Sequence, residues 1–126
     1  MNPIEGVSML PLDDRLVAYA KVLEKMTVKY PDDYEVWVFY ALMLQSSAPK
    51  DDRTYANQRK SAEILERLFA KAPQHPGAAH YLIHAYDFPP LAEKGISAAG
   101  KYAKIAPAAP HARHMPSHIY SMVGMW

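Results

Sequence analysis

The chain has 126 residues, half of them hydrophobic, so it is long enough to bury the core of one domain and too short for two. Its 14 Lys and Arg side chains balance 13 Asp and Glu side chains, which excludes the strong positive field that binds nucleic acids or anionic membranes. There is no cysteine, so a metal site would need His, Asp or Glu. No stretch approaches the roughly 20 apolar residues of a membrane span. We expect a soluble protein, cytoplasmic if Met1 is its native start.

Prolines divide the chain into segments with helical spacing of apolar residues. Residues 12–29, 55–71 and 91–105 show this spacing, and each segment ends just before Pro31, Pro73 or Pro107. Another helical candidate follows each proline, at residues 33–45, at residues 77–86 and somewhere within residues 111–126. The sequence therefore predicts an all-α fold of about six helices in three antiparallel pairs.

Acidic residues mark the start of the first two predicted helices. Asp13 and Asp14 are expected to cap the first helix, and Asp32 and Asp33 should favour the start of the second.

The spacing of the prolines indicates a repeat. Pro73 and Pro107 are 34 residues apart, whereas Pro31 and Pro73 are 42 apart, which predicts an insertion of eight residues. Residues 46–53 are polar and rich in turn formers, so we expect this insertion to be a surface loop.

The residues of the predicted pairs resemble the tetratricopeptide (TPR) repeat, whose first helix carries a large residue, a large–small pair and an aromatic residue. Three copies of this pattern can be read: Trp37, Tyr40–Ala41 and Leu44; Ala79, Leu82–Ile83 and Tyr86; Arg113, Pro116–Ser117 and Tyr120. The small-then-large pair of the second helix falls on Ser61 and Leu65, then on Gly95 and Ala99.

Two blocks, residues 75–87 and 110–120, also resemble those of uncharacterised bacterial TPR-containing proteins. The resemblance implies a single TPR-like domain over residues 1–126, stacked as a right-handed superhelix. It also implies a concave groove, lined by the first helices, that binds a protein or peptide ligand.

The register of the repeats predicts that both ends of the helix stack lack a capping helix. The chain begins on the second helix of one pair and ends on the first helix of another, and neither end has a polar cap. The final apolar run would then face water in a monomer: Ile119, Tyr120, Met122, Val123, Met125 and Trp126. We expect a fragment of a longer repeat array, or a homo-oligomer formed through the C-terminal helix; a last helix that folds back on its own core is the alternative.

The histidines carry the main functional signal. All six lie at or after residue 75: His75, His80, His84, His111, His114 and His118. His80 and His84 are four residues apart and share a helix face, as do His114 and His118, and the two pairs are one 34-residue repeat apart. Stacked repeats would bring the pairs side by side, with His111 next to the first pair. Because Pro116 interrupts a regular helix, we expect that helix to start near Pro116, with His111 and His114 on an extended lead-in.

Three interpretations of these residues stay open. In the first, His80, His84, His114 and His118 bind zinc, copper or nickel, with Asp87 as a carboxylate ligand. In the second, the polar side chains line a groove for an organic ligand. In the third, the histidines only support the fold through backbone hydrogen bonds and packing. Tyr81 occupies the position of the glutamate in the His-Glu-x-x-His motif, so a zinc-protease mechanism lacks its general base.

We therefore favour a TPR-like binding module over an enzyme. Its groove is predicted to display a polar set comprising His80, His84, Asp87, His111, His114 and His118. The alternative is a His-ligated metal-binding protein or a metal-dependent hydrolase that uses the same cluster with one coordination position left for water.

Overall fold

The fold is all-α. A computed structural model describes residues 10–125, and every regular element in this range is helical. The elements are α2 (Leu12–Lys29), α3 (Tyr34–Ser46), α4 (Ala56–Lys71), α5 (Pro76–Tyr86), η1 (Ala92–Gly95), α6 (Ile96–Ile105), α7 (Pro110–His114) and α8 (Pro116–Met122). Over the described range, no helix combines the length and the apolar character that crossing a membrane requires.

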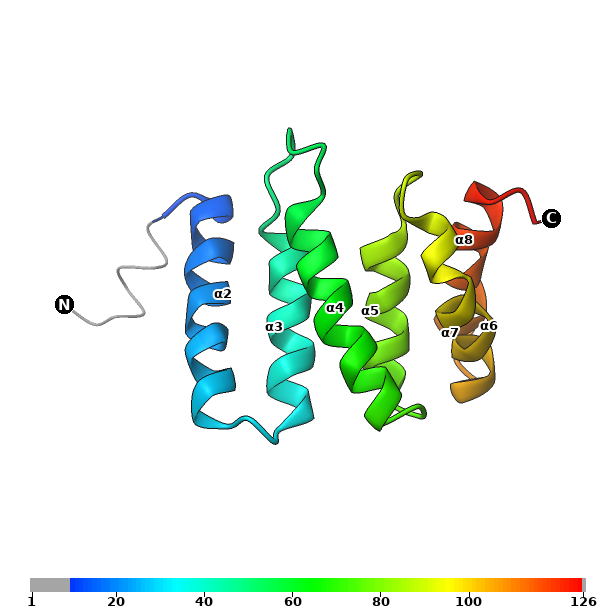
Figure 1. Cartoon of the computed structure of the whole chain (residues 1–126), viewed down its shortest axis with the longest axis horizontal. Helices are drawn as coiled ribbons and strands as arrows, with labels where there is room; N and C mark the ends of the chain where they lie inside the picture. Colours follow the sequence, from blue (N-terminus) through cyan, green and yellow to red (C-terminus); the bar gives the residue numbers. More distant parts are fainter. Residues whose placement is uncertain (1–9, 126) are drawn as a thin grey trace.

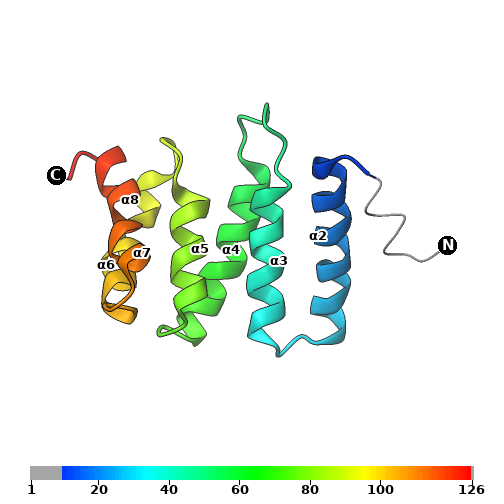
Figure 2. The same ribbon diagram turned by 180° about the vertical axis from the view of Figure 1, so that it is seen from behind.

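The helices stand side by side in a row that runs from one end of the chain to the other (Figure 1). Neighbours in sequence pack together from α2 to α6, and α6 packs against α8. A second set of contacts joins α3 to α5 and α5 to α8. Seen from behind, α3, α5 and α7–α8 therefore share one layer, which partly covers α4 and α6 (Figure 2). Helix pairs in two layers fit the predicted TPR-like arrangement, whose right-handed superhelical packing stays a prediction.

Polar side chains and prolines define the starts of the helices. The Asp33 carboxylate caps α3 by accepting hydrogen bonds from the backbone N–H groups of Glu35 at 3.0 Å and Val36 at 3.4 Å, which confirms the expected role of this residue. The predicted cap of the first helix is wrong. Asp13 and Asp14 lie inside the first turn of α2 and make no capping hydrogen bond, although their charge there still favours the positive end of the helix dipole.

The core runs between the two layers. Its largest fully buried side chains are Leu65, Leu82, Ile83, Leu91, Met115, Ile119 and Ser61. The only hydroxyl in this set is satisfied, because Ser61 Oγ donates to the carbonyl of Ala41 at 2.8 Å and accepts from Gln45 Nε2 at 2.7 Å. A buried polar group with both partners avoids the free-energy cost of desolvation without compensation. Ser61 therefore links α4 to α3 at the position where the repeat pattern expects a small residue.

Gly95 allows a second close contact, at the C-terminal end of the row. A Cβ atom at this position would lie 2.7 Å from Ile119 Cδ1 and 3.1 Å from Tyr86 Cβ. The first distance is shorter than any normal van der Waals contact, so a side chain there would force the Ile119 side chain, or the helix that carries it, to shift. The missing side chain therefore lets η1, α5 and α8 meet around Ile119.

Two expectations for the C-terminal third need correction. The predicted helix at residues 91–105 begins as the 3₁₀ turn η1 and becomes α-helical only at Ile96. The apolar run that was expected to face water is only partly exposed: Ile119 is fully buried, whereas Met122 and Met125 are 44% and 53% exposed. The last helix therefore folds onto its own core. Trp126 lies outside the described residues, and self-association through this helix stays a prediction.

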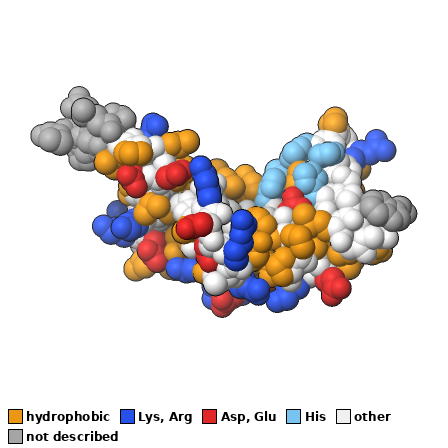
Figure 3. Space-filling view, turned by 90° about the horizontal axis from the view of Figure 1, so that it is seen from above, with side chains coloured by type: hydrophobic (Ala, Val, Ile, Leu, Met, Phe, Trp, Pro, Cys, Tyr) orange, Lys and Arg blue, Asp and Glu red, His pale blue; other side chains and the backbone are white. Residues whose placement is uncertain are grey.

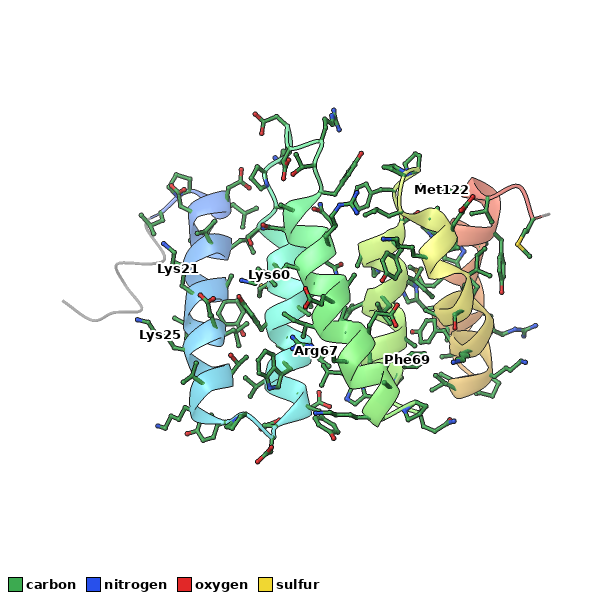
Figure 4. All side chains as sticks on the ribbon, in the orientation of Figure 1. Lys21, Lys25, Lys60, Arg67, Phe69 and Met122 are labelled. Carbon is green, nitrogen blue, oxygen red and sulfur yellow. The ribbon has the colours of Figure 1, made fainter. Side chains whose placement is uncertain are left out.

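Replacing Ile119 by alanine should destabilise the fold strongly. The substitution removes a fully buried side chain from the junction of α5, η1 and α8, and such a change costs about 2–5 kcal/mol. Met122→Ala is the control, because Met122 lies on the same helix near the C-terminal end of the row (Figure 4) but is 44% exposed, so its loss should cost much less, below about 1 kcal/mol. Chemical denaturation of the two variants measures both values. Equal effects would contradict the burial of Ile119.

Candidate metal centre

Helix α5 presents the first histidine pair. His80 and His84 are one turn apart on this helix and are half-buried, whereas Ala79, Leu82 and Ile83 are fully buried in the core. This separation confirms the predicted phase of the helix, in which the histidines occupy a different face from the packing residues. Asp87 follows directly as the residue that ends α5.

Helices α7 and α8 present the other three histidines of the predicted polar set. His111 and His114 lie on the short helix α7, so the predicted extended lead-in is wrong. Pro116 is the first residue of α8, as expected, but the chain before it is helical because the N–H of Met115 donates to the carbonyl of His111 at 2.9 Å. His118 lies in the first turn of α8.

Three histidines from two helices converge on one point. The Nε2 atom of His80 lies 3.1 Å from His84 Nε2 and 3.0 Å from His111 Nε2. Ligand atoms of all three side chains lie within 4.8 Å of one another, close enough to hold one metal ion. We call His80, His84 and His111 the histidine triad. Within the described residues, it is the only group of three or more His or acidic side chains whose ligand atoms converge in this way.

The remaining polar side chains form a second group beside the triad. His118 Nδ1 lies 2.9 Å from Asp87 Oδ2, and its Nε2 lies 3.0 Å from His114 Nε2. We call Asp87, His114 and His118 the Asp–His group. A carboxylate only accepts hydrogen bonds, so Nδ1 of His118 carries the proton and, in a neutral ring, Nε2 presents a lone pair.

The triad and the Asp–His group share one surface. The rings of His111 and His114 are 6.3 Å apart, and charges on both Asp87 and His118 act on His84. Viewed from above, the histidine side chains gather on one wall of a hollow in the molecule (Figure 3). The layer that carries them is formed by α5, α7 and α8.

Two tyrosines hold the central ring of the triad. The ring of Tyr102, from α6, stacks on His80 with centroids 5.3 Å apart and an interplanar angle of 11°, and Tyr81 stacks on it at 5.0 Å. Tyr102 is almost fully buried, and the sequence predicts it only as part of the helical segment at residues 91–105. No motif marks this role, because the contact joins side chains from different helices.

Burial controls the protonation of the triad. Burial, with additional repulsion from charge on His84 and His111, lowers the pKa of His80 from 6.5 to about 4. Burial also lowers the pKa of His84, although the Asp87 carboxylate opposes this effect. Near neutral pH the ring of His80 is therefore uncharged and can act as a ligand or a hydrogen-bond partner.

The structure groups the predicted site residues differently from the sequence. All six members of the predicted polar set lie on one surface, but His111 joins His80 and His84, whereas His114 and His118 pair with each other. The predicted metal ligands did not include His111. His75 lies apart from the cluster, because its Nδ1 accepts from the backbone of Ala78 as the cap of α5 and its Nε2 contacts Glu35 at 2.6 Å.

Comparison of the chain with family models, with curated proteins and with solved structures finds no match. The TPR resemblance therefore stays a prediction.

In the absence of metal, the stability of the protein should fall as the pH falls from about 6.5 to about 4. An unfolded chain binds a proton on His80 near pH 6.5, but the folded chain binds it only near pH 4, so acid favours unfolding across this interval. Allowing for solvent screening of this half-buried ring, we expect His80 to contribute about 1–2 kcal/mol to the loss. Denaturant unfolding of the wild type and His80→Gln, at several pH values with a chelator present, measures the difference. Parallel pH profiles would contradict the lowered pKa of His80.

Proposed function

We propose that this chain is a helical-repeat binding module whose hollowed surface holds a divalent transition-metal ion through His80, His84 and His111. The observation that carries the proposal is the convergence of the three Nε2 atoms, two pairs of which are 3.0 and 3.1 Å apart. Imidazole nitrogens are common ligands for zinc, copper and nickel, and a pair four residues apart on a helix can bind one ion together.

The separations of the nitrogens suit a small ion. A tetrahedral zinc ion with bonds of about 2.0–2.1 Å to nitrogen separates its ligand atoms by about 3.3 Å. The two short distances in the triad are within about 0.3 Å of this value, and all three ligand atoms lie within 4.8 Å of one another, so rotation of the rings could bring them to ligand geometry. The third ligand comes from α7, which means that the ion would also join α5 to the C-terminal helices.

Hydrogen bonds alone do not explain this convergence well. The single Nε2 atom of His80 faces two other Nε2 atoms, and it can either donate one proton or accept with one lone pair. If it donates, the proton is shared between two acceptors; if it accepts, two donors compete for one lone pair. A cation satisfies all three lone pairs at once. The lowered pKa of His80 supports the proposal further, because a neutral ring can bind a metal without first losing a proton.

The ligand set indicates the class of metal and the state of the site. Three imidazoles without a thiolate favour zinc, copper or nickel over magnesium or calcium, which prefer oxygen ligands. Three protein ligands leave a four-coordinate ion one position for water, as in catalytic rather than structural zinc sites. A metal-dependent hydrolase, the alternative considered from the sequence, would use this open position.

Replacing His111 by alanine should weaken zinc binding by more than ~100-fold, because loss of a direct ligand exceeds the 10–100-fold effect of losing an outer partner. His114→Ala is the matched control, since it removes another exposed histidine from the same short helix. In His114→Ala, the affinity for the most tightly bound ion should stay within about threefold of the wild-type value. Zinc titration calorimetry of metal-free, untagged protein measures both.

The two substitutions also separate the triad from the ligand set predicted from the sequence. That set contains His114 but not His111. If His114→Ala abolished binding of the tightest ion and His111→Ala did not, the triad would be the wrong ligand set. If the wild type bound no zinc, copper or nickel, the proposed function would be wrong.

A second candidate function is the binding of a peptide or small organic ligand on the same surface. A pocket lined by Leu42, Gln45, Ser46, Gln58, His84 and Phe88 opens between α3, α4 and the end of α5. Its wall includes His84, so a ligand in this pocket would reach the triad. The pocket combines apolar side chains with a few polar groups, as ligand sites commonly do.

Peptide selection tests this second candidate. Peptides enriched from a random library on the wild-type protein should lose binding at least ~10-fold to Leu42→Glu, which places a charge in the pocket. Val28→Glu, on the exposed face of α2, is the control and should retain binding. No enrichment, or equal binding to both variants, would count against a groove at this place.

A further inference from the structure

We propose that the Asp–His group is a second metal position, in which the Nε2 atoms of His114 and His118 hold another divalent transition-metal ion beside the triad. This inference rests on the proposed function, because both positions would take the same class of ion in one centre. It assigns separate roles to side chains that the sequence placed in a single ligand set.

The second pair reproduces the geometry of the first. His114 and His118 are four residues apart, as are His80 and His84, and their Nε2 atoms are 3.0 Å apart, compared with 3.1 Å in the first pair. The match occurs although the helix is interrupted at Pro116 in one pair and continuous in the other. Both pairs therefore have the separation that two ligands of one small ion need.

Asp87 prepares His118 to be a ligand. The carboxylate lies 2.9 Å from His118 Nδ1, so it accepts the proton of that nitrogen and leaves the Nε2 lone pair facing His114. Metal-binding histidines commonly donate their other N–H to a carboxylate in this way, which fixes the orientation of the ring and raises its basicity. In this arrangement Asp87 is a positioning residue and not a direct ligand, which differs from its role in the sequence prediction.

The second position is open to solvent. His114 is exposed, and the side chains of His118 and Asp87 are 36% and 22% exposed. An ion can therefore reach the two nitrogens directly and complete its coordination with water. A plain hydrogen bond between His114 and His118 at such a surface contributes little stability, about 0.5–1.5 kcal/mol, and does not require a carboxylate behind one ring.

The number of ligands and the repulsion between two cations predict the order in which the two positions fill. The triad supplies three ligands and the second position only two. Asp87, which contacts His118, is the carboxylate of this cluster. Two dications close together repel each other more than one carboxylate can offset. The triad should therefore fill first and with higher affinity, and the second ion should bind more weakly.

Zinc titration of the full chain, with bound metal counted by elemental analysis after equilibrium dialysis, tests the inference. We expect two ions per wild-type chain, with a tight and a weak phase. His118→Gln should remove only the weak phase. His111→Ala should abolish the tight phase and leave only weak binding, because the remaining pair of His80 and His84 has the geometry of the second position. Asp87→Asn should weaken the second ion by about 10–100-fold without changing the first. Asp51→Asn, in the exposed loop before α4, is the matched control and should bind like wild type.

The outcomes separate the two proposals. A single ion that is lost in His111→Ala and retained in His118→Gln would overturn the second position and leave the triad in place. No bound ion in the wild type would overturn both proposals. Two ions that both survive His118→Gln would also overturn this inference, because the second ion would then bind elsewhere. Far-ultraviolet circular dichroism of each variant ensures that a lost phase is not caused by unfolding.

Discussion

The close approach of α8 to α5 is the constraint on which the histidine cluster depends. It is possible because Gly95 has no side chain: a Cβ there would lie 2.7 Å from Ile119 Cδ1. Ile119 is therefore buried in the core, and α8 packs against α5 while α7 packs against α6 and α8. The three C-terminal histidines lie on these two helices, so the packing around Gly95 helps to place them near His80 and Asp87.

The cluster makes the folded protein less stable in acid. Burial lowers the pKa of His80 from 6.5 to about 4, so protonation of this ring is costly in the folded state. Tyr81 and Tyr102 each stack on the ring of His80 and hold it in place without using its nitrogens. Aromatic packing and burial thus orient the ring of His80, whereas the ring of His118 is oriented by a hydrogen bond to Asp87. The two halves of the cluster are built by different interactions.

The same cluster joins separate parts of the fold. The His80–His111 and Asp87–His118 contacts both connect α5 to the C-terminal helices, across 31 residues of sequence. A metal ion in the triad would strengthen the first of these connections, since an ion that binds only the folded protein stabilises it by an amount that grows with the logarithm of its affinity. Such binding would therefore be coupled to the docking of α7 and α8.

The sequence by itself determined the helical class, the helix boundaries to within a few residues, the polar loop and the surface that carries the histidines. These features are local: proline stops a helix, and a spacing of four residues places two side chains on one face whatever surrounds them. The structure differs from the sequence prediction in three local details: Asp13 and Asp14 do not cap the first helix, the segment at residues 91–105 begins as a 3₁₀ turn, and the chain before Pro116 is helical.

Only the tertiary structure decided which histidines meet. The choice of His111 for the triad, the pairing of Asp87 with His118 and the stacking of Tyr102 on His80 depend on helix packing and ring orientation. A 34-residue period brings whole helices side by side, but it does not select one nitrogen among several within a few ångströms. Close packing around Gly95 and Ile119 makes that selection, because it sets the distance between the helices that carry these rings.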